Sequence, residues 1–105
     1  MHDQSLFIGF MGDSPTIRVF DYLLTERELD FSITDIAKNA AIGRTTLYRI
    51  FDNLVTHNII VPTRIIGKAK LFRLNTQNNK IQKLIEIYDM MTIHELKKKK
   101  IKVIA

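Results

Sequence analysis

The sequence predicts one small α+β domain, mainly helical, with a single β-hairpin and an extra helix at its C-terminal end. A chain of 105 residues has the length of one domain. Apolar residues recur at helical spacing along most of residues 15–96. The helical spacing stops at residues 59–74, where β-branched residues lie on both sides of a glycine, a pattern typical of a β-hairpin. We expect an N-terminal arm (1–14), a compact domain (15–75), a C-terminal helix (76–96) and a basic tail (97–105).

The composition excludes several kinds of chemistry. The chain has no cysteine, and therefore no disulfide, cysteine-ligated zinc or cysteine nucleophile. His2, His57 and His94 lack the spacing of a metal-ligand set. Paired carboxylates, a nucleophile with its base and a phosphate-binding loop are not recognisable, so we expect no catalytic residue, metal or cofactor, and no enzyme. Residues 6–11 are too short a run for a membrane span or signal peptide, which favours a cytoplasmic protein without membrane contact.

Positive charge is concentrated in one part of the chain. The net charge is +5, but residues 1–42 hold three basic and seven acidic residues, whereas residues 43–74 hold six basic residues and one acidic residue. Such segregation steers a polyanion toward one face, so residues 43–74 are predicted to face nucleic acid. The tail adds five lysines. We expect the tail to be flexible and to contact phosphates, or alternatively a partner.

The first long helix is predicted to begin at Ser14-Pro15, with serine as N-cap and proline in the first turn, and to end near Arg27 or Leu29. The arm before it contains apolar residues, but Gly9 and Gly12 oppose a long helix. The arm packs either on this domain or on a partner subunit. The residues on the buried face of the first helix are expected to be Ile17, Phe20, Leu23 and Leu24.

Two shorter helices follow, separated by a tight turn. Thr34 is the predicted N-cap of the first, the turn falls at residues 40–42, and Gly43 caps the next helix. Asn58 is predicted to end that helix in the left-handed conformation. The inward residues of the two helices are expected to be Ile33, Ile36, Ala37, Ala40, Leu47, Ile50, Phe51 and Leu54.

The hairpin is predicted to turn at Gly67, with Pro62 near a strand start or edge and Phe72 and Leu74 in the core. Residues 31–32 are expected to form a short strand. After a polar break, a C-terminal helix of about five turns is expected. Its apolar stripe either folds back on the first helix or pairs across a two-fold axis with its copy, and its residues are Ile81, Leu84, Ile85, Tyr88 and Met91.

These residues resemble a known family. Residues 33–37, the run Gly43 to Arg49, Leu54, residues 58–60 and the Gly67 hairpin are similar to a prokaryotic winged helix-turn-helix transcriptional regulator of the ArsR or MarR type. The resemblance covers about residues 15–75. The family commonly has glycine where Ala41 stands, and alanine fits there with a negative φ. Metal-sensing members use cysteine and histidine clusters that are absent here, and no small-molecule effector is inferred.

The resemblance implies sequence-specific binding of double-stranded DNA, with the third helix in the major groove. Arg44 and Arg49 are the candidates for guanine edges or phosphates, because guanidinium binds both in a bidentate manner. Thr45 and Thr46 are expected to contact phosphates or a thymine methyl, and Tyr48 a phosphate. The alternatives are that the threonines cap the helix, that Arg49 pairs with Asp52, and that Tyr48 is a packing residue.

The hairpin corresponds to the wing. Arg64, Lys68 and Lys70 are predicted to contact phosphates or the adjacent minor groove. Because a single recognition helix rarely supplies enough affinity, we expect a homodimer and favour pairing through the C-terminal helix, with the N-terminal arm as a further candidate contact. The expected dimerisation residues are Ile81, Leu84, Ile85, Tyr88 and Met91. The alternative function is a winged-helix protein-interaction module in a larger assembly, indicated by two apolar residues beside the wing tip, Ile65 and Ile66.

Overall fold

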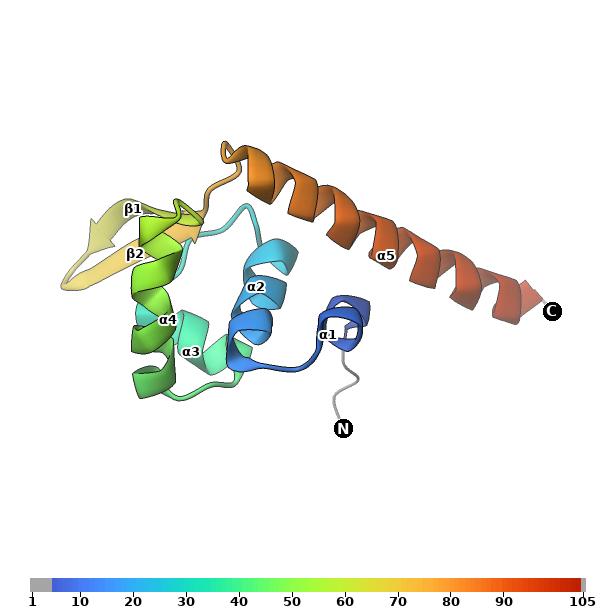
Figure 1. Ribbon diagram of the computed structural model, residues 1–105, viewed down its shortest axis with the longest axis horizontal. Coiled ribbons are helices and arrows are strands. Elements are labelled where there is room, and N and C mark those ends of the chain that lie inside the picture. The colour runs from blue at the N-terminus through green and yellow to red at the C-terminus, as the bar shows by residue number, and fades with distance from the viewer. Residues whose placement is uncertain (1–4, 105) are drawn as a thin grey trace.

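The computed structural model describes the backbone of residues 5–104 and the side chains of residues 5–93. A compact body of short helices carries a two-stranded hairpin at one end and a long helix at the other (Figure 1). The predicted α+β class is confirmed. The elements in order are α1 (Leu6–Met11), α2 (Pro15–Thr25), α3 (Ile33–Ala40), α4 (Arg44–Thr56), β1 (Ile60–Ile66), β2 (Ala69–Leu74) and α5 (Asn79–Ile104).

Helix α2 begins where the sequence predicts. The Ser14 hydroxyl accepts a hydrogen bond from the Ile17 amide, and Pro15 occupies the first turn. The predicted end near Arg27 or Leu29 is wrong, because the helix ends at Thr25. The chain turns there, and the Arg27 side chain donates to the Leu24 carbonyl, which the helix leaves without an internal donor.

Helix α3 begins two residues earlier than predicted. Its N-cap is Ser32, and not Thr34. The Ser32 hydroxyl accepts from the Asp35 amide at 3.1 Å, and the Asp35 carboxylate accepts from the Ser32 amide at 3.2 Å. This reciprocal pair satisfies two backbone donors that the start of a helix leaves free, which a cap at Thr34 would not do.

The turn between α3 and α4 contains a left-handed alanine. Ala41 has φ 57° and ψ 48°, so it does not take the negative φ that would suit alanine but the left-handed conformation that favours glycine. This conformation lets the Ala41 and Ile42 amides donate back to carbonyls in the last turn of α3. It also turns the Ala41 carbonyl toward Arg18, whose guanidinium donates to it at 3.1 Å. The hydrogen bonds at the end of α3 therefore determine the turn, although alanine disfavours this region.

We predict that Ala41→Gly stabilises the protein by about 0.5–1 kcal/mol in urea unfolding, since glycine adopts positive φ without the clash of a Cβ. Ala41 is exposed, so no packing is lost. The matched control is Ala69→Gly, at an exposed strand residue without positive φ, which should lower stability. A glycine at position 41 that lowers stability as much as the control would contradict the prediction.

The hairpin has an antiparallel register from Ile60 opposite Leu74 to Ile66 opposite Ala69, with a bulge between Pro62 and Arg64. Gly67, at φ 61°, confirms the predicted tip. Phe31 exchanges two backbone hydrogen bonds with Phe72, so the short strand expected at residues 31–32 is a single bridge on the outer side of β2. This bridge joins the hairpin to the helical body.

The core lies between α2, α3, α4 and the base of the hairpin. The Phe72 ring meets Phe51 of α4 edge-on at 4.9 Å between ring centroids. Asn58 has the predicted left-handed conformation at the end of α4. Val19 is fully buried and is not among the predicted core residues, although its spacing of four from Leu23 indicates the same face of α2. The predicted residues that are buried are Leu23, Leu24, Ile36, Ala37, Ala40, Leu47, Leu54, Phe72 and Leu74, and those half-buried against the core are Ile17, Phe20, Ile33, Ile50 and Phe51.

Helix α5 folds back over α1 and α2 (Figure 1). The Tyr88 ring contacts the ring of buried Phe7, with 5.7 Å between the ring centroids, and the Tyr88 hydroxyl forms a hydrogen bond with Thr25. The Arg27 guanidinium donates two hydrogen bonds to Asp89, at 2.6 and 3.1 Å. The described part of the arm therefore packs on its own domain through Phe7. The apolar stripe does too: Ile81 is buried, and the residues half-buried against the core are Leu84, Ile85, Tyr88 and Met91.

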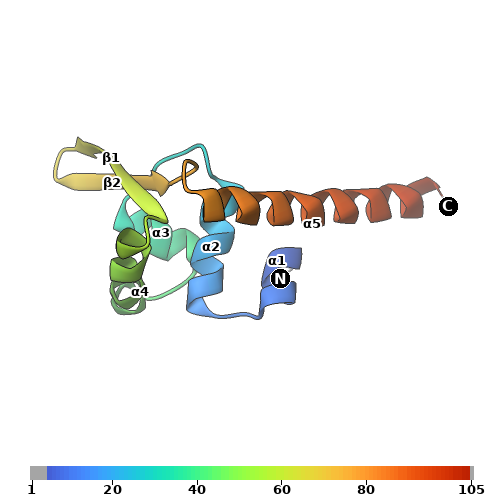
Figure 2. The same ribbon diagram turned by 45° about the horizontal axis from the view of Figure 1, so that its top comes forward.

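The last helix is longer than expected. It spans 26 residues instead of about five turns, and it continues to Ile104 through the segment that we predicted to be flexible. The end of α5 extends beyond the rest of the molecule (Figure 2). Side chains from residue 94 onward lie outside the described residues, and with them the predicted contacts of the basic tail. Among the residues described, no helix has the length and apolarity needed to cross a membrane.

Candidate nucleic-acid interface

Helix α4 lies on the body by one face and leaves the other open. Leu47 and Leu54 are fully buried and attach the helix to the core. The exposed residues between them are polar or charged, and they are Tyr48, Arg49, Asp52 and Asn53. Gly43 caps the helix without a side-chain hydrogen bond, and apart from its chain neighbours no other atom lies within 4 Å of the position that a Cβ would take there. The N-terminal half of α4 is therefore open to a ligand.

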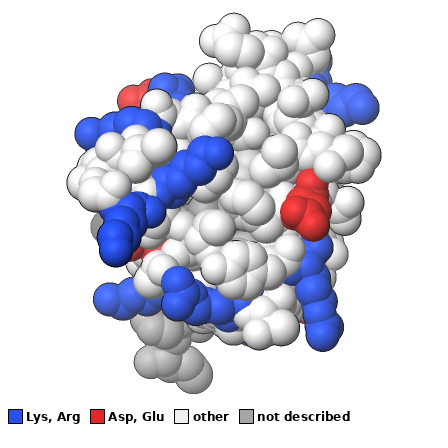
Figure 3. All heavy atoms as spheres, turned by 90° about the vertical axis from the view of Figure 1, so that its left-hand side faces the viewer, with Lys and Arg blue, Asp and Glu red and all other residues white. Residues whose placement is uncertain are grey.

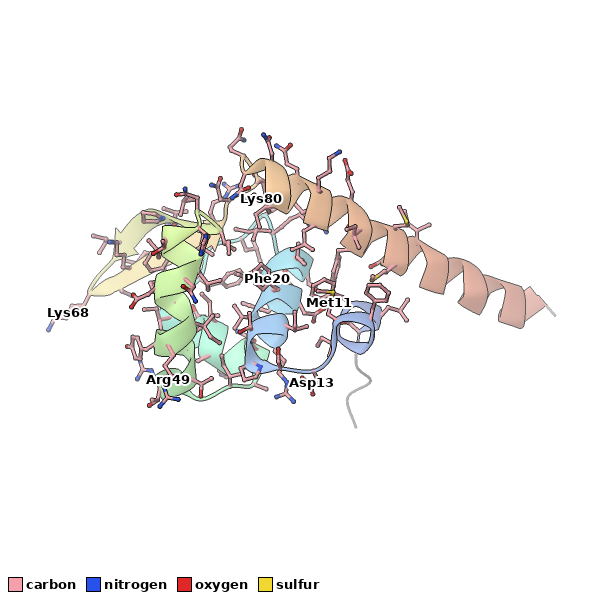
Figure 4. The ribbon with its side chains drawn as sticks, in the orientation of Figure 1. Met11, Asp13, Phe20, Arg49, Lys68 and Lys80 are labelled. Atoms are coloured by element: carbon pink, nitrogen blue, oxygen red, sulfur yellow. The ribbon has the colours of Figure 1, made fainter. Side chains whose placement is uncertain are left out.

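The predicted contact residues gather in this half of α4. Arg44, Thr45, Tyr48 and Arg49 are exposed, and Thr46 is half-buried. The structure brings these five residues together on one end of the helix, where Arg49 projects outward (Figure 4). Tyr48 is 53 % exposed, so about half of its surface is open to solvent.

A residue that the sequence analysis assigned to a cap has a different role. Thr34 accepts a hydrogen bond from the Arg44 guanidinium at 2.7 Å between Nη2 and Oγ1. This contact joins α3 to the start of α4 and orients the guanidinium. Arg49 forms no ion pair with Asp52 or with another carboxylate among the side chains that the structure describes. The guanidinium of Arg49 is therefore available to an external anion.

The hairpin places its basic residues in two different situations. Lys68 is exposed at the tip, and Lys70 is exposed on β2 with its ammonium 5.7 Å from the Phe72 ring centroid. Arg64, in contrast, pairs with Asp30 through two hydrogen bonds of 2.9 and 3.1 Å, and the Thr63 hydroxyl donates to the same carboxylate at 2.6 Å. Arg64 thereby attaches β1, within the hairpin, to the segment between α2 and α3.

The Arg64 pair perturbs the carboxylate that it binds. Hydrogen bonds from Arg64 and then Thr63 hold the pKa of Asp30 below its ordinary 3.8. The same hydrogen bond to Asp30 raises the pKa of Arg64. A lowered carboxylate pKa means that the pair stabilises the fold above the ordinary pKa, and that this stabilisation is lost as the pH falls through the lowered value.

We predict that Asp30→Asn loosens the attachment of the hairpin to the helical body at neutral pH. Exchange of the Phe31 and Phe72 amide protons should become faster by about two- to five-fold, a modest effect because the Arg64 side of the pair is largely exposed to solvent. In the wild type the same loosening should occur only below pH 3.8. Equal exchange in both proteins at neutral pH would show that the ion pair does not hold the hairpin.

The face that α4 and the hairpin form is basic. Lysine and arginine side chains surround a mostly uncharged centre on this face, and acidic side chains are few (Figure 3). Arg49 and Lys68 project toward this same side of the molecule (Figure 4). The described residues contain no group of three potential metal ligands. The arrangement is suited to binding a polyanion through hydrogen bonds and charge.

The fold is similar to that of several solved structures. No family model and no curated protein matches the chain. Among solved structures it is similar to MepR, a transcription regulator of the Staphylococcus aureus multidrug efflux pump MepA, with a TM-score of 0.58 and 20 % identity over 87 % of this chain and 68 % of that one. The chain has the winged-helix fold. In this fold α3 and α4 are the helix-turn-helix, and β1 and β2 are the wing.

Two further winged-helix structures give the same result. AntR, an antimony-specific transcriptional repressor, has a TM-score of 0.56 and 15 % identity over 93 % of both chains. The MarR family transcriptional regulator SPO1453 from Silicibacter pomeroyi DSS-3 has a TM-score of 0.54 and 18 % identity, and covers 85 % of this chain and 63 % of its own. The winged-helix resemblance that the sequence indicated is therefore confirmed for the fold.

Proposed function

We propose that this winged-helix chain is a transcriptional regulator that binds double-stranded DNA with sequence specificity. The observation that carries the proposal is the open, basic N-terminal half of α4 beside a basic wing (Figure 3). An α-helix of this kind fits the major groove with its N-terminal turns directed at base edges. The similar solved structures support the proposal, since MepR, AntR and SPO1453 are described as transcription regulators.

Each contact residue has a proposed role. Arg44 and Arg49 bind guanine edges or phosphates, because a guanidinium donates two parallel hydrogen bonds to either. Thr45 and Thr46 bind phosphates or a thymine methyl group, and the Tyr48 hydroxyl donates to a phosphate. The hydrogen bond from Arg44 to Thr34 leaves the other guanidinium nitrogens of Arg44 for DNA.

The wing contributes through its lysines. Lys68 at the tip and Lys70 on β2 contact phosphates or the adjacent minor groove, which adds affinity more than sequence choice. Arg64 is 62 % exposed at its side chain while it pairs with Asp30. We assign Arg64 first to positioning the wing, and a phosphate contact of Arg64 would use the nitrogens that Asp30 does not occupy.

We also propose that the protein acts as a homodimer through α1 and α5. Phe10 of α1 is 74 % exposed and Met90 of α5 is 68 % exposed. Ile87, Met90 and Ile93 recur at helical spacing on the side of α5 opposite Tyr88, which packs on the core. A second copy covering these residues would remove them from water, and a two-fold axis would place two copies of α4 about 34 Å apart on DNA.

The proposal is tested by selecting bound duplexes from a random library at two salt concentrations. An enriched palindrome is the expected result, because a two-fold dimer reads two equal half-sites. The slope of affinity against salt counts the phosphate contacts. Uniform weak binding would indicate an architectural protein without sequence specificity. No binding would favour the protein-interaction module instead.

A further inference from the structure

The wing ends in exposed apolar side chains. Ile65 is 68 % exposed and Ile66 is 55 % exposed, directly before the tip at Gly67. Water is an unfavourable environment for two adjacent isoleucines, and the described part of the chain does not cover them. Their position at the end of a projecting hairpin indicates that a partner covers them.

The register distributes these side chains over both faces of the hairpin. Ile65 lies opposite Lys70, on the same face of the hairpin as Phe72. This is the face whose Phe72 ring contacts Phe51 of α4. Ile66 lies opposite Ala69 on the other face. The tip therefore has an apolar side chain on each side, with Lys70 across the strands from Ile65 and Lys68 two residues after Ile66.

The charge around the tip identifies the kind of partner. The sequence has no acidic residue from Asn53 to Ile85, so the wing has no negative charge of its own. Lys68, at the tip, projects to the same side as Arg49 of α4 (Figure 4). A partner must therefore offer negative charge beside an apolar surface. The minor groove of DNA offers both, since its rims are phosphates and its walls and floor are sugars and base edges.

Building on the proposed function, we propose that the wing tip is an apolar wedge that enters the minor groove and bends the DNA. Ile65 and Ile66 press against a base step beside the half-site that α4 reads, and partly unstack it. Lys68 and Lys70 bind the phosphates on the groove rims. Pyrimidine–purine steps unstack most easily, so the wing prefers such a step without forming a hydrogen bond to its bases.

The test compares the full-length wild type with Ile65→Thr/Ile66→Thr on one selected duplex. Threonine keeps the β-branched shape that suits a strand but removes the apolar end. The duplex carries fluorophores at both ends, for the bend angle, and 2-aminopurine at the base step beside the half-site, for unstacking. Leu29→Gln, which makes an exposed leucine outside the wing polar, is the matched control.

The wild type and the control should bend the duplex and raise the 2-aminopurine fluorescence. The double threonine variant should lose both signals and bind about 10-fold more weakly with an unchanged salt slope, because no phosphate contact is removed. Lys68→Gln/Lys70→Gln should lower the salt slope instead. Thermal unfolding followed by circular dichroism verifies that the variants are folded.

Two outcomes would overturn the wedge and leave the proposed function standing: wild-type protein that binds its site without bending it, or a threonine variant that bends it equally. If the wild type binds no duplex, the proposed function fails together with the wedge. Retained binding and bending in the threonine variant would assign the isoleucines to a protein partner.

Discussion

Arg44→Ala/Arg49→Ala should lower the affinity for the selected duplex by about 100-fold or more, since each bidentate contact to a base or phosphate contributes about 1–3 kcal/mol. Both side chains are exposed at the N-terminal half of α4. The free energy of unfolding should therefore change little. Fluorescence anisotropy titrations measure the affinity, and urea unfolding measures the stability.

The control for charge is Lys80→Ala/Lys83→Ala, which removes two positive charges from exposed residues at the start of α5, outside α4 and the wing (Figure 4). Long-range attraction alone would make the two double variants equally weak. The contacts proposed here predict a small loss for the lysine variant and a reduced salt slope only for the arginine variant. Arginine variants that bind as tightly as the wild type would refute the assignment of α4 to the major groove.

Ile87→Glu/Met90→Glu should dissociate the proposed homodimer. Both residues are exposed on the single chain, so the substitutions leave the fold intact, but a dimer that covers them would have to bury two unpaired carboxylates. Because each such burial costs several kcal/mol, the dimer dissociation constant should rise by at least about 100-fold. Sedimentation measures the mass, and binding to a palindrome should weaken more than binding to a half-site.

Leu29→Glu is the control for this second experiment, because it adds the same charge at an exposed leucine outside α1 and α5. It should leave the mass and the DNA affinity unchanged. A wild type that sediments as a monomer at all concentrations would exclude the dimer. A dimer that survives both α5 substitutions would place its contact elsewhere on the chain.

Local sequence patterns determined most of the architecture. The pair Ser14-Pro15 marks the start of α2 because a hydroxyl cap and a residue without an amide proton both suit the first turn. The spacing of Leu47 and Leu54 on α4 identified its buried face, and therefore also the exposed face that carries Arg49. These signals can be recognised in the sequence because each depends on residues within about two helical turns of one another.

Contacts between distant segments decided the rest. The partner of Arg64 is Asp30, 34 positions away, so no local pattern distinguishes a wing arginine that binds DNA from one that positions the wing. The packing of α5 also depends on distant residues. The sequence allowed its apolar stripe to pack either on its own core or on a second copy, and the Phe7–Tyr88 contact places Tyr88 on its own core. Ala41 takes a conformation that alanine disfavours, because the hydrogen bonds at the end of α3 outweigh the local preference. Periodicity and capping reflect the preferences of neighbouring residues. The partner of an ion pair, the surface on which a helix packs and the strain at a turn depend instead on which surfaces meet when the chain folds.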